Sequence, residues 1–213
     1  AYEMLQGDWS SDVYSSDLSS GGKRKIFFML TYLQLLLFHA LRDPFLYPDS
    51  QSYFNVYNII KDNESFYDII SDPQVLFRFE PGYVLFNYFT SIFFPSDNSL
   101  FVVSSVIIVT GYLFAVYKYS RSPILSVIII ILYPMIFLQS FFVLRQHLAC
   151  AIFMFSLPYI ERRKFWSFLL ILLIAISFHY SALILLPIYW IYNSNYSVLN
   201  IRHFPILVFI VFL

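Results

Sequence analysis

The chain has 213 residues, of which 59% are hydrophobic, 22% are aromatic and only 12% are charged. Soluble domains carry about 25% charged residues, so a chain this short could not hide its apolar surface from water. The formal net charge is zero, which gives no sign of a nucleic-acid partner, and the single cysteine, Cys150, cannot form an intrachain disulfide. The composition therefore excludes an ordinary soluble domain and indicates an integral membrane protein.

Residues 1–22 differ in composition from the rest of the chain. They are polar, rich in serine and aspartate, end in Gly-Gly and show no helical periodicity. We interpret them as a non-native or disordered leader that takes no part in the fold. The transmembrane helical domain is then expected to span residues 23–213, beginning at the basic triplet Lys23-Arg24-Lys25.

Apolar runs follow the leader at 26–41, 83–94, 99–117, 123–140, 142–160, 165–178, 181–192 and 204–213. A spanning helix needs about 17–25 residues, and most runs reach that length once their amphipathic ends are included. The run at 83–94 is too short, because about a dozen residues extend only about 18 Å. The pattern predicts an all-α, polytopic transmembrane bundle of about six to seven spanning helices and one re-entrant or interfacial helix. The last run stops at Leu213, which indicates truncation at the C-terminus. Because the leader is interpreted as non-native, we expect a fragment truncated at both ends.

The positive charges suggest an orientation. Lys23-Arg24-Lys25 is expected in the cytoplasm, which places the polar segment 42–82 outside as an extracytoplasmic loop. That segment carries three basic and seven acidic residues, in agreement with an outer position. If the run 83–94 does not cross, the later basic clusters all fall inside, so we predict that it is re-entrant or interfacial at the outer face. These clusters are Lys118 with Arg121, Arg162-Arg163-Lys164, and Arg202.

In this topology the unusual ionisable residues collect at the outer boundary. They are Asp43, Asp49, Glu80, Arg145, His147 and His179. A charge at membrane depth costs at least ~2.5–3.5 kcal/mol, so such residues are usually paired or face a wet cavity. Each has a simpler interpretation too: Arg145 as a snorkelling cation, Glu80 as a loop carboxylate, and His179 as a helix-end histidine. His39, isolated in the first apolar run, is interpreted as structural.

Four short motifs, in this order, resemble the EpsG family of Wzy-like exopolysaccharide, capsular and O-antigen polymerases. The motifs are LRDPFLYPDSQSY at 41–53, Glu80-Pro81-Gly82-Tyr83, Leu144-Arg145-Gln146-His147-Leu148-Ala149, and Phe178-His179-Tyr180-Ser181-Ala182-Leu183. The resemblance covers about residues 25–195. Pro44 and Pro48 stand where many relatives have a glycine before the aspartate, so either Asp43 or Asp49 could occupy the family position; the spacing to Tyr53 favours Asp49.

The resemblance implies polymerisation of oligosaccharide repeat units carried on polyprenyl pyrophosphate. The reaction is expected at the extracytoplasmic face of the bacterial cytoplasmic (inner) membrane, with lipid pyrophosphate as leaving group. The sequence itself, with zero net charge, no metal-ligand cysteine pair and no glycine-rich phosphate loop, predicts no cofactor, no metal and no nucleic-acid partner. The expected partners are the lipid-linked oligosaccharide, the lipid bilayer and other polysaccharide assembly proteins.

Roles follow for individual residues. Glu80 or Asp49 is predicted to act as general base or to orient the acceptor, and His179 to make a second phosphate or acid–base contact. Arg145 is assigned to the pyrophosphate. The remaining predicted substrate-binding residues are Arg42, Asp43, Tyr53, His147 and Ser181.

Two other classes of function are compatible with the same residues. A transporter or flippase of lipid-linked saccharide could use converging charges as a translocation site, although transporters usually show paired helical halves with a midplane site. The sequence shows no internal repeat. A non-catalytic membrane subunit of a polysaccharide biosynthesis complex is the other alternative.

Overall fold

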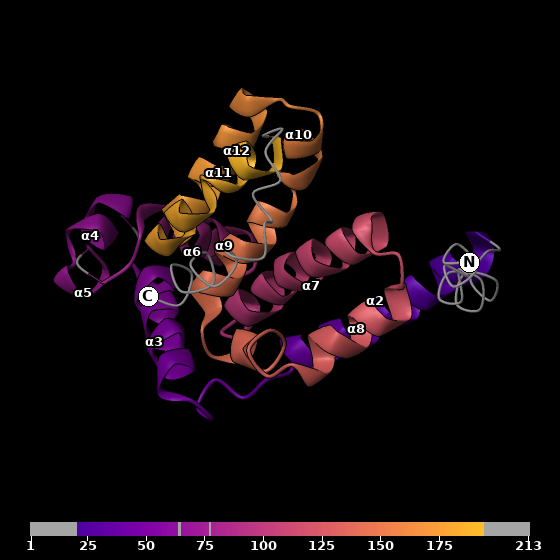
Figure 1. Ribbon diagram of the computed structural model, residues 1–213. Coiled ribbons are helices and arrows are strands. Elements are labelled where there is room, and N and C mark those ends of the chain that lie inside the picture. The colour runs from indigo at the N-terminus through magenta and orange to yellow at the C-terminus, as the bar shows by residue number, and fades with distance from the viewer. Residues whose placement is uncertain (1–20, 64, 77, 194–213) are drawn as a thin grey trace, which may run out of the picture.

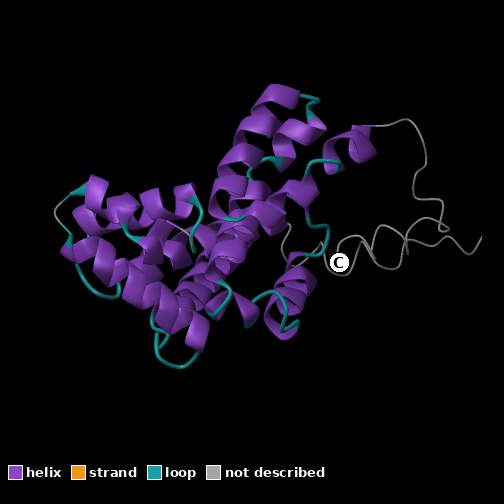
Figure 2. Cartoon of the chain, turned by 90° about the vertical axis from the view of Figure 1, so that its left-hand side faces the viewer, coloured by secondary structure: helices purple, strands orange, loops and turns teal. Residues whose placement is uncertain are grey.

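The computed structural model describes residues 21–193, except 64 and 77, and this part of the chain is helical with no strand (Figures 1 and 2). The predicted all-α class is therefore confirmed for the described residues. Residues 1–20 of the predicted leader and the apolar run at 204–213 lie outside them. Gly21 and Gly22, expected to belong to the leader, begin helix α2 (Gly21–Ala40).

A row of long helices forms the frame of the molecule. Helix α7 (Ser99–Tyr119) contacts α2 on one side and α9 (Leu144–Met154) on the other, and α9 in turn contacts α11 (Phe165–Phe178). Helix α8 (Pro123–Leu132) lies beside α7 (Figure 1). At Gly111, an added Cβ would lie 2.5 Å from the backbone oxygen of Ala151, so the glycine permits the close approach of α7 and α9.

The polar segment 42–82, expected as a loop, contains three helices. They are α3 (Pro48–Asp62), α4 (Phe66–Ser71) and α5 (Pro73–Leu76). Pro48 occupies the first turn of α3, where its missing N–H costs nothing. One face of α3 is buried at Tyr53, Val56, Tyr57 and Ile60, which is helical spacing. This face packs against α6 (Pro81–Phe93).

Prolines divide three of the predicted spanning runs. The run 123–140 is α-helical only to Leu132, two residues before Pro134, because proline disfavours helical backbone at the residue before it. The run 142–160 is split into α9 and α10 (Leu157–Glu161), with Pro158 in the first turn of α10. The run 181–192 becomes the 3-10 segment η2 (Tyr180–Leu185) and α12 (Ile188–Asn193), separated by Pro187.

Among the described helices, α7 alone is long and apolar enough to cross a membrane by length and composition. The count of six to seven spanning helices therefore stays a prediction. Helix α6 has 13 residues and extends about 20 Å, in agreement with the expected short helix. Its re-entrant placement also stays a prediction. Large apolar side chains such as Leu37, Phe93, Leu132 and Trp166 are more than half exposed, which suits a lipid environment better than water.

Candidate functional site

Glu80 lies near the end of the polar segment 42–82 and immediately precedes α6. Pro81 begins the helix, which fixes the direction in which the chain enters it. At Gly82, an added Cβ would lie 2.7 Å from the Cβ and 2.8 Å from the backbone oxygen of Ser177, on α11. The absence of a side chain at Gly82 therefore lets the start of α6 approach the end of α11, where His179 follows.

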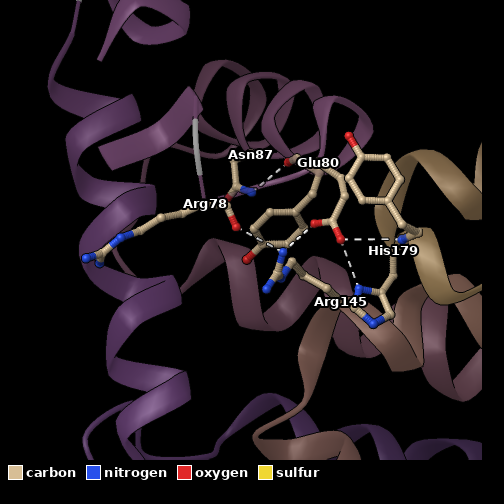
Figure 3. A network of polar contacts seen from close by, with 7 residues as sticks. Arg78, Glu80, Asn87, Arg145 and His179 are labelled. Atoms are coloured by element: carbon tan, nitrogen blue, oxygen red, sulfur yellow. Dashed lines mark hydrogen bonds and ion pairs between the residues drawn. The ribbon is translucent and has the colours of Figure 1, made fainter. Parts of the chain in front are cut away.

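The Glu80 carboxylate joins Arg145, on α9, and His179, the residue that follows α11 (Figure 3). Its Oε2 forms an ion pair and hydrogen bond with Nη1 of Arg145, in the first turn of α9. Its Oε1 lies 2.9 Å from Nδ1 of His179 and 3.4 Å from the backbone N of Tyr180, which donates to it. Glu80 is only 5% exposed, so both of its oxygens are engaged inside the protein.

Arg145 is held on several sides. Its Nη1 also donates to the backbone oxygen of Arg78 at 3.2 Å, and its guanidinium carbon lies 5.0 Å from the ring centre of Phe79 and 5.8 Å from that of Tyr53. Cations are attracted to aromatic faces at these distances. A cation in the first turn of a helix opposes the helix dipole, so Arg145 depends on Glu80 and these rings for its stability. The guanidinium of Arg78 points away from Glu80 (Figure 3).

The charges of the network determine which atom of His179 carries a proton. Burial by itself raises the pKa of Glu80, but its own backbone N–H, Arg145 and His179 together lower that pKa below the ordinary value. Glu80 is therefore ionised at neutral pH and can only accept hydrogen bonds. Nδ1 of His179 must then be the donor. In the neutral imidazole, Nε2 is left as a free base.

The structure brings four of the predicted site residues together. Glu80, Arg145 and His179 form the network, and Tyr53 lies beside Arg145 and is buried. Ser181 is exposed and lies two residues after His179, next to Tyr180, whose backbone N–H donates to Glu80.

Other predicted residues lie elsewhere. Asp43 is exposed and accepts a hydrogen bond from the backbone N of Phe45 at 2.8 Å. Asp49 is exposed in the first turn of α3. His147 lies on another side of α9 from Arg145: its Nδ1 is 2.6 Å from the hydroxyl of Tyr112, and it lines a separate cavity of about 310 Å³.

Arg42 and His39 belong to a second polar cluster. Nη1 of Arg42 donates to the backbone oxygens of Ser140 and Phe141 at 3.1 and 3.0 Å. His39 is fully buried, with Nδ1 2.7 Å from the hydroxyl of Ser105 and Nε2 2.8 Å from that of Ser140. Both ring nitrogens are thus occupied by protein groups, which agrees with the structural role predicted for His39.

Sequence reasoning did not assign several groups that build the site. These are the Arg78 carbonyl, the Phe79 ring, Gly82 and the Tyr180 N–H. Two further residues of α6, Tyr83 and Asn87, are fully buried, and Nδ2 of Asn87 donates to the Tyr83 carbonyl at 2.7 Å (Figure 3). The run Glu80-Pro81-Gly82-Tyr83 carried the signal for this region. Within the described residues, no group of three or more His, Cys, Asp or Glu side chains could hold a metal ion.

Comparison with known proteins gives one match. The sequence pattern of the EpsG family matches residues 25–213, a range that contains the whole Glu80 network. The chain belongs to the EpsG family. EpsG membership places it among the membrane proteins of polysaccharide biosynthesis, as the four motifs predicted. No curated protein and no solved structure matches the chain.

Proposed function

We propose that this EpsG-family chain is a glycosyltransferase that joins polyprenyl-pyrophosphate-linked oligosaccharide repeat units during exopolysaccharide or capsule biosynthesis. The observation that carries the proposal is the buried Glu80 carboxylate, which holds an arginine with one oxygen and a histidine with the other. Such a site places a cation for an anionic leaving group beside an oriented base for an acceptor hydroxyl.

In the proposed reaction, His179 takes the proton. The acceptor sugar oxygen attacks the anomeric carbon of the donor, the bond from that carbon to the pyrophosphate oxygen breaks, and lipid pyrophosphate leaves as an anion. Nε2 of His179 accepts the proton of the attacking hydroxyl. Its side chain is 27% exposed, so it can meet a substrate.

Glu80 acts on the reaction through His179. Because both Glu80 oxygens are engaged, we assign the base to His179 in place of Glu80. The carboxylate orients the imidazole and stabilises the imidazolium that forms when Nε2 is protonated. Asp49, the other predicted base, is exposed on α3 and is given no part in this proton transfer.

Arg145 is proposed to bind the leaving pyrophosphate. Its hydrogen bonds to Glu80 and to the Arg78 carbonyl both use Nη1. A guanidinium has five N–H donors, so the group keeps capacity for a phosphate oxygen. The side chain is 23% exposed. Phe79 and Tyr53 limit its movement from the sides.

Two contacts support the proposed extracytoplasmic position of the α6–α7 turn. Lys61, at the end of α3, forms an ion pair with Asp97, and the hydroxyl of Tyr57 donates to the backbone oxygen of Phe94 at 3.0 Å. Since α3 belongs to the acidic segment 42–82, both ends of α6 then lie near that segment. A re-entrant α6 would keep both of its ends at the outer face with α3, and the proposed topology then leaves the later basic clusters in the cytoplasm.

The test is an assay of the full-length protein in liposomes with a synthetic lipid-linked repeat unit. We expect chain extension by the wild type and its loss in His179→Gln and Arg145→Gln, with membrane insertion retained. Arg121→Gln, which changes an exposed arginine between α7 and α8, is the matched control. Translocation of the lipid without extension would identify a flippase instead. Normal polymer from His179→Gln or Arg145→Gln would remove that residue from the site.

A further inference from the structure

Three polar side chains from α2, α3 and the chain between them fix the short segment that precedes α9. Nε2 of His39 contacts the hydroxyl of Ser140 at 2.8 Å, and Nη1 of Arg42 donates to the carbonyls of Ser140 and Phe141. The hydroxyl of Ser50 donates to the same Phe141 carbonyl at 2.9 Å. We call His39, Arg42 and Ser50 the 139–141 clamp, after the segment Gln139–Phe141 that they hold.

Two of the clamp residues also contact α7. His39 is fully buried and its other nitrogen contacts Ser105 on α7. The guanidinium carbon of Arg42 lies 4.5 Å from the ring centre of Phe101, also on α7. Among the described residues, no carboxylate forms an ion pair with Arg42. Its guanidinium contacts two backbone carbonyls through Nη1 and an aromatic face, while its buried Nε and Nη2 have no hydrogen-bond partner among the described residues. The charged bonds from Nη1 fix the positions of those two carbonyls.

The clamped segment leads directly into the first turn of α9. The backbone N of Val143 donates to the Gln139 carbonyl at 2.9 Å, and α9 begins at the next residue, Leu144. Little freedom remains between the clamp and Arg145.

Helix α3 touches the same region twice. Ser50 binds Phe141, and Tyr53, almost one turn further along α3, places its ring 5.8 Å from the guanidinium carbon of Arg145. Phe141 and Arg145 are four residues apart along the chain. The Ser50 bond therefore sets the register in which α3 lies against the start of α9, and with it the position of the Tyr53 ring.

We infer that His39, Arg42 and Ser50 are positioning residues for Arg145. By fixing segment 139–141, they set where the guanidinium lies relative to Glu80 and to the leaving pyrophosphate; this consequence rests on the proposed function. Arg42 acts through the backbone of Ser140 and Phe141, so the substrate contact predicted for it from the sequence is replaced by an indirect role.

A double-mutant cycle with Arg145 tests the inference. Arg42→Lys keeps the charge, but its ammonium ends one bond short of the position of Nη1, the single nitrogen that donates to both carbonyls. We expect the KM for the lipid-linked donor to rise about tenfold in Arg42→Lys, which is the effect of losing about one charged hydrogen bond. In an Arg145→Lys background the same change should add less than about twofold, because both residues act through one guanidinium. Arg121→Lys is the matched control and should change neither value. If the double variant instead raises the KM by the product of the two single-variant factors, the inference is wrong.

A second measurement does not depend on enzyme activity. Amide hydrogen exchange in nanodiscs should accelerate in Arg42→Lys over residues 137–148 and stay unchanged over α11. Ser50→Ala, a milder change, should give a smaller effect in the same region if Arg42→Lys fails to fold. The inference is wrong if amide exchange in Arg42→Lys is unchanged over residues 137–148, or if it accelerates equally along the whole chain. Local acceleration in a protein whose wild type extends no chains would support the clamp and refute the proposed function.

Discussion

Replacing Gly82 with alanine tests directly how the site is assembled. The added Cβ would lie 2.8 Å from the backbone oxygen of Ser177, whereas ordinary contact begins at 3.4 Å. The two backbones must therefore separate by about 0.6 Å. The Ser177 side chain is closer still, and its Cβ would lie 2.7 Å from the added Cβ. A serine side chain is too short to bend away, so it cannot relieve the clash by itself.

The separation should reach the network without attenuation. Glu80 lies two residues before Gly82, and His179 lies two residues after Ser177. An increase of about 0.6 Å in the 2.9 Å distance between Oε1 and Nδ1 gives about 3.5 Å, beyond the range of a good hydrogen bond. The imidazole then loses its orientation, and we expect kcat to fall about 10–100-fold. The strain should also lower stability by about 1–3 kcal/mol.

The assay is the initial rate of chain extension in liposomes, normalised to the amount of folded protein. Gly22→Ala is the control, because an added Cβ there meets nothing within 4 Å. Adding Ser177→Gly to Gly82→Ala should restore only part of the rate, since the backbone oxygen remains in place. A wild-type rate in Gly82→Ala at equal folded protein would refute the reasoning, and so would an equal loss in Gly22→Ala.

Three further predictions address charge, burial and topology. The pKa of Glu80 is lowered in the folded protein, so its carboxylate stabilises the fold fully above its ordinary value of about 4.5 and loses this effect as the pH falls through the lowered pKa. Glu80→Gln should therefore have a lower melting temperature than the wild type at neutral pH, and this difference should shrink in acid. A difference in melting temperature that stays constant from about pH 3 to pH 7 would contradict this. His39→Ala should lower the free energy of unfolding by about 1–3 kcal/mol, because it leaves two buried hydroxyls without their imidazole partner. An unchanged melting temperature would show that these hydrogen bonds are dispensable. In a Cys150→Ala background, Asp97→Cys should react with an impermeant maleimide from outside the cell. The substitution removes the exposed ion pair between Asp97 and Lys61, which should cost little stability. Labelling only after lysis would overturn the predicted topology.

Local sequence information was sufficient for the helical class and for the short helix α6. Apolar runs and their lengths depend on neighbouring residues only, and the motif Glu80-Pro81-Gly82-Tyr83 marked the start of α6. The helix interruptions were also visible in the sequence, as Pro134, Pro158 and Pro187, although the continuous hydrophobicity around them suggested unbroken spans. The face of α3 was equally readable, but the acidic composition of 42–82 suggested a loop.

Local sequence information did not show which of the candidate residues lie in the site. His147 stands two residues from Arg145, yet two steps along a helix turn the side chain by about 200°, so it faces Tyr112 and a different cavity. Arg42 and Asp49 were equally plausible from their charge, and only packing directs the first toward backbone carbonyls and leaves the second exposed.

The sequence by itself determined that the chain is helical, suited to a membrane, and equipped with Glu80, Arg145 and His179 in the motifs of the EpsG family. Tertiary structure decided that these three residues meet. Glu80 is 65 residues from Arg145 and 99 from His179 along the chain, and no local pattern encodes such separations. They meet because a glycine on α6 lets two helices approach within backbone contact, and because a buried carboxylate is stable only where opposite charge and hydrogen-bond donors surround it.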